Sequence, residues 1–158
     1  MIINSLFYRL SHSRIACLAA LALATLALSN LSFAGDIHDA ARAGDLAKVK
    51  ALLKDNPALA SSKDHDGWTP LHIAADSGHR DMAELLLANH AHVNAKDKDI
   101  WTPLHWAAYE GHKDVAELLL ANHANVNAED NDGETPLMYA TIKSHWDMAE
   151  LLRQHGGH

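Results

Sequence analysis

A 33-residue internal repeat constrains this chain more than any other feature of its sequence. The triplet TPL begins at Thr69, Thr102 and Thr135, and the segment AELLLANHAHVNAKD recurs 33 residues later as AELLLANHANVNAED. An earlier copy, IHDAARAGDLAKVKALLKDNPAL, begins at Ile37 and is offset by 34 residues because the loop after it holds one extra residue. A period of this length predicts a row of stacked supersecondary units instead of a domain folded around one closed core.

Each TPL triplet predicts where a helix begins. Its threonine suits the N-cap, and its proline suits the first helical position, where a missing N–H costs nothing. Gly78 and Gly111 predict left-handed helix ends, and a second helix with one apolar face follows each of them. Because helix pairs this short cannot bury that face alone, neighbouring pairs must stack. The motif residues are Thr69, Pro70, Leu71 and His72, then Thr102, Pro103, Leu104 and His105, and finally Thr135, Pro136 and Leu137.

The segments TPLHIAADSGH and TPLHWAAYEGH and the tails VNAKD and VNAED resemble the ankyrin repeat family, and the resemblance covers residues 35–158. It implies an all-α solenoid of about four stacked helix–turn–helix units with hairpin loops. The repeats are expected at approximately 35–66, 67–99, 100–132 and 133–158. The resemblance also implies that His72 and His105 hydrogen-bond within their own turn and to the neighbouring repeat. His79, His112 and His145, after the inter-helix turn, are expected to be structural.

Residues 1–34 are predicted to be a cleavable signal peptide. Arg9 and Arg14 precede an apolar run of 14 residues, IACLAALALATLAL, which is short for a membrane span, and SNLSFA then offers small residues for cleavage before Gly35. An uncleaved membrane anchor is the alternative. Cys17, the only cysteine, lies inside this run, so cleavage would leave a chain without thiols. We expect export to the periplasm, or secretion.

The charge of the remaining chain bears on its partner. Removing Arg9 and Arg14 from the 13 basic residues leaves 11 against 20 acidic ones, a formal charge of −9 for residues 35–158. This charge argues against nucleic acid, and against a membrane surface once the signal is cleaved. It favours a protein partner of basic or mixed charge, although solubility alone explains it equally well. We expect the protein to be a monomer.

Twelve histidines within residues 35–158 raise the question of a metal site. His90 and His123 occupy the helix-ending position where the family usually has glycine, so a left-handed conformation is expected there, as at Asn56 and Gly156 in the outer repeats. A weak transition-metal site is a minor alternative, because imidazole suits zinc, copper and nickel. Its ligands would be His90, His92, His123, His155 and His158. The favoured interpretation has no metal.

Catalysis is not expected. No serine lies in a nucleophile-elbow pattern, no cysteine remains after cleavage, and a glycine-rich phosphate-binding loop is absent from the sequence. Paired acids recur at the repeat period, which assigns them to hairpin turns, where Asp bonds its own backbone. These pairs are Asp64 and Asp66, Asp97 and Asp99, and Asp130 and Asp132. We therefore expect neither an enzyme nor a cofactor.

The family resemblance instead implies protein binding through a surface made of hairpin tips and first helices. Trp68 and Trp101 stand out as exposed aromatics of a kind enriched in binding hot spots, the alternative being that each indole covers the adjacent hairpin backbone. Trp106 is expected in the core between repeats. The candidate binding residues are His65, Asp66, Trp68, Asp76, Ser77, Lys98, Asp99, Ile100, Trp101, Tyr109, Glu110, Asn131, Asp132, Glu134, Ile142 and Lys143.

Ile100 is the least ordinary of these residues. Its neighbours in the repeat have Gly67 and Gly133 at the same turn position, and a β-branched residue resists the conformations that glycine adopts there. The middle hairpin is therefore expected to be built differently or to be strained. Beside Trp101, Ile100 would add an apolar tip to the centre of the predicted face.

Three functional classes follow from non-covalent protein binding. The first is an interaction module that holds or protects one partner. The second is an inhibitor or immunity-type protein that neutralises a toxin or hydrolase. The third is a secreted effector that acts on a host protein.

Overall fold

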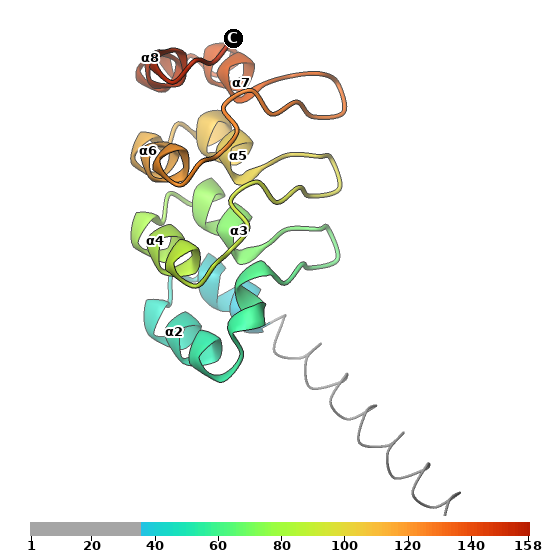
Figure 1. The fold of residues 1–158 in the computed structure, drawn as a ribbon, viewed down its shortest axis with the longest axis vertical. Coiled ribbons are helices and arrows are strands. Elements are labelled where there is room, and N and C mark those ends of the chain that lie inside the picture. The colour runs from blue at the N-terminus through green and yellow to red at the C-terminus, as the bar shows by residue number, and fades with distance from the viewer. Residues whose placement is uncertain (1–35) are drawn as a thin grey trace, which may run out of the picture. The chain divides into compact units, whose positions relative to one another are not determined.

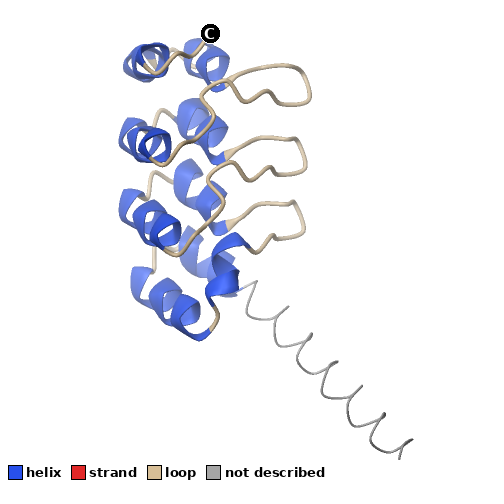
Figure 2. Ribbon diagram, viewed as in Figure 1, coloured by secondary structure: helices blue, strands red, loops and turns tan. Residues whose placement is uncertain are grey.

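The computed structural model describes residues 36–158, so the predicted signal peptide at 1–34 lies outside the described residues. Within 36–158 all regular structure is helical and no strand occurs (Figure 2), which confirms the all-α prediction. The elements are a helix at 36–42, α2 (Leu46–Asp55), the 3-10 helix η1 (Pro57–Ser61), α3 (Pro70–Asp76), α4 (Arg80–Ala88), α5 (Pro103–Glu110), α6 (Lys113–Ala121), α7 (Pro136–Ile142) and α8 (Trp146–Gln154).

The helices form two layers. One layer consists of α2, α4, α6 and α8, and the other holds α3, α5 and α7, with three hairpin loops projecting from it in the same direction (Figure 1). Each helix packs on its counterpart in the next repeat as well as on its own partner, as α5 does with α3, α6 and α7. We call the surface formed by the hairpins and α3, α5 and α7 the hairpin face.

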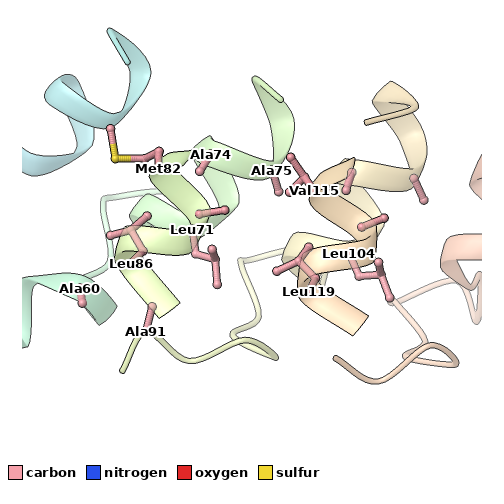
Figure 3. Packing of buried hydrophobic residues seen from close by; sticks show 14 of the residues in the cluster. Ala60, Leu71, Ala74, Ala75, Met82, Leu86, Ala91, Leu104, Val115 and Leu119 are labelled. Carbon is pink, nitrogen blue, oxygen red and sulfur yellow. The ribbon is translucent and has the colours of Figure 1, made fainter. Parts of the chain in front are cut away.

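The core runs continuously through the stack instead of closing within one repeat. Leu71 and Leu86 lie in one repeat, and Leu104 and Leu119 take the corresponding places in the next (Figure 3). All four are fully buried. Burial of each such side chain contributes roughly 1.5–3 kcal/mol, and only the neighbouring repeat completes that burial.

The TPL motif begins each inner helix as predicted. Thr69, Thr102 and Thr135 are the N-caps of α3, α5 and α7, and a proline follows each one. The backbone N–H of Thr69 donates to Nδ1 of His72 at 3.0 Å, and that of Thr102 donates to Nδ1 of His105 at 3.1 Å. A ring nitrogen that accepts a backbone N–H carries no proton, so both imidazoles have their proton on Nε2.

That Nε2 proton connects one repeat to the next. Nε2 of His72 donates to the carbonyl of Trp101 at 3.1 Å, and Nε2 of His105 donates to the carbonyl of Glu134 at 3.3 Å. His38 makes the same contact in the first repeat, 2.9 Å from the carbonyl of Trp68. Each accepting carbonyl immediately precedes the N-cap position of the following repeat. The expected histidine contacts are thus confirmed.

A second set of histidines points back toward the preceding repeat. Nε2 of His112 lies 3.0 Å from the carbonyl of Asp76, and Nε2 of His145 lies 3.0 Å from that of Tyr109. The His112 ring covers Gly78, which adopts φ +69°, and a Cβ added there would lie 2.6 Å from its Nδ1. Glycine is therefore required at this helix end both for the backbone conformation and for the ring.

The left-handed positions after the outer helices match the prediction in part. His90 and His123 adopt φ of 62° and 67°, and Gly156 adopts 88°. The prediction for Asn56 is wrong, because its φ is −146°. Asn56 precedes Pro57, which disfavours helical conformations in the residue before it, and η1 takes the place of the turn.

The hairpins share one set of hydrogen bonds. Oδ1 of Asp97 accepts the N–H groups of Asp99 and Trp101, each at 2.9 Å. Asp64 and Asp130 do the same in their own hairpins. The turn assignment is therefore confirmed for the first acid of each pair. The second acid supplies only a backbone N–H to this turn, and its side chain is exposed.

Ile100 occupies the same turn as the glycines, in the same conformation. Its φ is 66°, against 82° for Gly67 and 78° for Gly133, and its N–H donates to the Asp97 carbonyl as theirs do to Asp64 and Asp130. Of the two alternatives, a different turn is excluded. A β-branched residue is held in a left-handed conformation that costs it roughly 1–2 kcal/mol.

None of the helices in residues 36–158 is both long enough and apolar enough to cross a membrane.

The buried histidines predict acid sensitivity. Burial lowers the pKa of His72 from 6.5 to about 4, and burial also lowers the pKa of His105. As the pH falls, the unfolded chain binds these protons before the folded chain does. The contribution of the neutral histidines to the free energy of unfolding is therefore complete above about pH 6.5 and falls away toward pH 4. For His72 the loss reaches roughly 3 kcal/mol. Urea unfolding at several pH values should show it.

Two variants make this measurement specific. His72→Gln keeps a donor but does not titrate, so it should flatten the dependence of the free energy of unfolding on pH. His92→Gln, at an exposed position, should leave that dependence intact. An unchanged slope in His72→Gln contradicts the assignment to the buried imidazole.

The strain at Ile100 predicts that glycine stabilises this position. Ile100→Gly should raise the free energy of unfolding by roughly 1 kcal/mol, because relief of the left-handed strain exceeds the entropy cost of glycine. The matched control is Gly133→Ala, whose added Cβ meets no atom within 4 Å. Its expected loss, also roughly 1 kcal/mol, comes from the backbone alone. A destabilised Ile100→Gly would show that packing of the isoleucine outweighs the strain.

Candidate functional site

Five aromatic side chains form a continuous band across the hairpin face, which we call the aromatic stripe: Trp68, Trp101, Trp106, Tyr109 and Tyr139. The Trp106 ring lies 4.4 Å from that of Trp68 and 4.5 Å from that of Trp101, between centroids. Trp101 in turn lies 4.3 Å from Tyr139 and 5.6 Å from Tyr109. All five are half-buried, so each presents part of its ring to solvent.

Two hairpin carboxylates orient the stripe. Trp106 Nε1 donates to Oδ2 of Asp97 at 3.1 Å, and the Tyr139 hydroxyl donates to Oδ2 of Asp130 at 2.6 Å. The other oxygen of each carboxylate holds its own turn, so one aspartate fixes both the hairpin and an aromatic ring. Asp97 is buried, with 8% of its surface exposed, and three N–H groups compensate its charge.

The stripe ends at the second repeat, where the same position holds Ile73. This side chain is buried and offers no hydrogen-bond donor to Asp64. Asp64 Oδ1 still holds the turn at Asp66 and Trp68. The second oxygen of Asp64 therefore lacks the partner that its counterparts Asp97 and Asp130 have.

A hollow of about 470 Å³ lies at this end of the stripe. Two indoles, four carboxylates and three basic side chains line it, namely Trp68, Trp106, Asp64, Asp66, Asp76, Asp99, Arg42, Lys98 and His65. The hollow thus combines aromatic surface with an excess of acid.

The charges around the hollow are unequally paired. Asp66 contacts Lys98 at 3.4 Å and His65 at 2.8 Å. Arg42 pairs with Asp39 at 3.5 Å. Burial raises the pKa of Asp76, and the neighbouring Glu110 raises it further, while His112 and Arg42 act in the opposite direction. The Asp76 carboxylate is therefore incompletely solvated, and the nearby basic groups compensate for this only in part.

The structure brings some of the predicted binding residues together. His65, Asp66, Trp68, Asp76, Lys98 and Asp99 line the hollow. Trp101 and Tyr109 belong to the stripe, and Lys143 extends it, with Nζ 3.9 Å from the centroid of the Tyr109 ring. Trp68 and Trp101 each pack on Trp106 from the inner helix.

Other predicted residues lie apart from the hollow. Ile100 lines a separate hollow of about 380 Å³, together with Asn94, Lys96 and Asn127 among others. Ile100 therefore adds no apolar surface to the hollow beside Trp68 and Trp106. The Glu134 side chain is half-buried, and its carbonyl accepts the bond from His105. The remaining residues line neither hollow and are exposed or half-exposed: Ser77, Glu110, Asn131, Asp132 and Ile142.

The sequence did not indicate that Trp106 forms the centre of the stripe. Trp106 was expected in the core between repeats, and this is confirmed in part: the indole packs against the core but stays half-buried, between two other indoles. An aspartate nine residues before an aromatic donor, as in Asp97 with Trp106 and Asp130 with Tyr139, is the signal that could have identified it. Isoleucine takes the aromatic position in the repeat before.

The proposed metal ligands are not gathered into one site. Within residues 36–158 no group of three or more His, Cys, Asp or Glu side chains is placed to hold a metal ion. His155 Nδ1 lies 2.9 Å from the Leu151 carbonyl, and the backbone N–H of His158 donates to Asn127. The minor metal alternative therefore has no geometric basis here.

Comparison with known proteins identifies the repeats. The family described as ankyrin repeats (3 copies) matches residues 37–97 and 96–158. Human protein phosphatase 1 regulatory subunit 27 is 39% identical over 66 residues, which are 42% of this chain and 40% of that protein. Human NAD-capped RNA hydrolase NUDT12 is 38% identical over 50 residues, 32% of this chain and 11% of that protein.

A rice protein named as probable E3 ubiquitin-protein ligase XBOS32 is 49% identical over 49 residues, 30% of this chain and 10% of that protein. The chain thus spans less than half the length of each of these relatives. Their sequence matches are partial, whereas the family match and the stacked helix pairs extend through nearly all of residues 36–158. The chain belongs to the ankyrin repeat family.

Proposed function

We propose that this protein acts by binding a protein partner non-covalently through the hairpin face, without catalysis and without a cofactor. The observation that carries the proposal is the aromatic stripe. Its five rings form one band over three repeats while each keeps part of its surface exposed. Aromatic residues are enriched among the residues that dominate the binding energy of protein interfaces.

The charge favours a partner with basic or mixed surface. Residues 35–158 carry a formal charge of −9, and the hollow beside the stripe is lined by four carboxylates. Complementary charge speeds the encounter and excludes acidic partners, nucleic acid included. On this proposal the protein works as a monomer, with the hairpin face free to receive the partner.

The place of action is proposed from residues 1–34, which have the pattern of a signal peptide. The protein would then be periplasmic or secreted, and free of the membrane after cleavage. Mass spectrometry of the protein from periplasmic extract tests this. A chain that begins at Gly35 supports export with cleavage, a chain that still begins at Met1 contradicts cleavage, and absence of the protein from the extract contradicts export to the periplasm.

Among the three functional classes, the inhibitor of an enzyme has one specific observation in its favour. One relative is named as a regulatory subunit of a phosphatase. An inhibitor of a toxin or hydrolase would act in the same way, by occupying an enzyme without chemistry of its own. A module that holds or protects one partner and a secreted effector remain the other candidates.

Affinity capture with variants of the stripe tests the binding face. Wild-type protein and a Trp68→Ala/Trp101→Ala double variant are each used as bait in periplasmic extract. The double variant should retain at least about tenfold less partner, because loss of hot-spot aromatics costs about 2 kcal/mol or more. Quantitative mass spectrometry of the captured proteins measures this.

Trp146→Ala is the matched control. Trp146 is 62% exposed and begins α8, outside the stripe. Its truncation should leave capture unchanged, and thermal unfolding of each bait checks that all three are folded. Equal retention of the same partner by the double variant would place the binding surface elsewhere.

A further inference from the structure

We propose that the hollow between Trp68, Trp106 and Asp76 binds an arginine side chain of the partner. This inference rests on the proposed function, since it assigns one contact within the hairpin face. The hollow combines the two features that a guanidinium group requires, which are aromatic faces and carboxylates at several positions.

The aromatic stripe already binds a cation elsewhere on the same face. Lys143 Nζ lies 3.9 Å from the centroid of the Tyr109 ring, which shows that these rings attract positive charge. Among residues 36–158 no lysine or arginine lies in this way over Trp68 or Trp106. The basic residues that line the hollow are drawn to carboxylates instead, Lys98 to Asp66 and Arg42 to Asp39.

The carboxylates of the hollow are left with acceptor capacity. Asp64 has no aromatic donor for its second oxygen, because Ile73 stands where Trp106 and Tyr139 serve the other hairpins. The side chains of Asp76 and Asp99 make no hydrogen bond or ion pair within residues 36–158. Asp76 is half-buried beside Glu110, and both features raise its pKa, so an added positive charge would stabilise its carboxylate.

Arginine fits this arrangement better than lysine. The Trp68 and Trp106 rings pack directly on each other, 4.4 Å between centroids, so a ligand must lie along their exposed surfaces instead of between them. A planar guanidinium can stack on such a surface while its five N–H donors reach more than one carboxylate. An ammonium group is a compact, strongly hydrated charge and gains less from an open hollow.

Titration with short peptides tests the proposal directly. The probes are acetyl-Gly-Arg-Gly-amide and its lysine and citrulline counterparts, citrulline being a neutral side chain of nearly the same shape. NMR spectra of the indole Nε1–H groups report binding at Trp68 and Trp106. The arginine peptide should shift both signals with a dissociation constant on the order of 1 mM. The lysine peptide should bind at least about threefold more weakly, and the citrulline peptide about tenfold more weakly.

Asp76→Asn should weaken binding of the arginine peptide about tenfold. Its matched control is Asp55→Asn, which removes the same charge from an exposed position at the end of α2, outside the hollow and outside the candidate binding residues, and should leave binding unchanged. Thermal unfolding of both variants checks that they remain folded.

Three results would overturn the proposal: no shift of the Trp68 and Trp106 signals at peptide concentrations of about 10 mM, equal binding of the citrulline peptide, or equal binding by Asp76→Asn. Equal binding of the lysine peptide would overturn the choice of arginine. This failure is distinct from failure of the proposed function. If the Trp68→Ala/Trp101→Ala variant loses its partner while the arginine peptide does not bind, only the arginine site is wrong.

Discussion

The hydrogen bond from a histidine Nε2 to a carbonyl of the next repeat is the contact on which the rest of the structure depends. His38, His72 and His105 each make it, and each accepting carbonyl directly precedes the following N-cap position. Helix pairs of this length leave their apolar face open, so stability comes from contacts between repeats. Because the imidazole also closes its own turn at Nδ1, it sets the end of one hairpin relative to the inner helix of the repeat before.

The candidate binding surface depends on this alignment of neighbouring repeats. Because the hairpins project in the same direction, Asp97 and Asp130 occupy equivalent positions in successive repeats. Each accepts hydrogen bonds both from its own turn and from an aromatic side chain. Trp106 then lies between the hairpin tryptophans of two repeats. The repeated position that holds Trp106 and Tyr139 holds isoleucine at position 73. The stripe therefore ends there, and the acidic hollow lies at that end.

Much of the fold could be predicted from the repeat period, because Thr-Pro helix starts, glycine ends and turn aspartates act over a few residues. The stripe depends instead on contacts between residues that lie farther apart in the sequence. Ile73 fits in the core, whereas the larger indole of Trp106 stays half-buried and donates its N–H to the buried Asp97. Asn56 departed from its repeat because Pro57 follows it. The surroundings of Ile100 could not be predicted from its own repeat, because the next hairpin helps to form the hollow that Ile100 lines.

Long-range proton–nitrogen NMR correlation of the histidine rings tests the inter-repeat contact most directly. We expect that at pH 7 His72 and His105 are neutral and carry their proton on Nε2, because Nδ1 accepts a backbone N–H and burial lowers both pKa values. Their Nε2 protons should give slowly exchanging signals. Each signal should show through-space contacts, His72 to Trp101 and His105 to Glu134. Imidazolium rings at that pH, or neutral rings protonated on Nδ1, would show that these histidines do not hold the repeats in register.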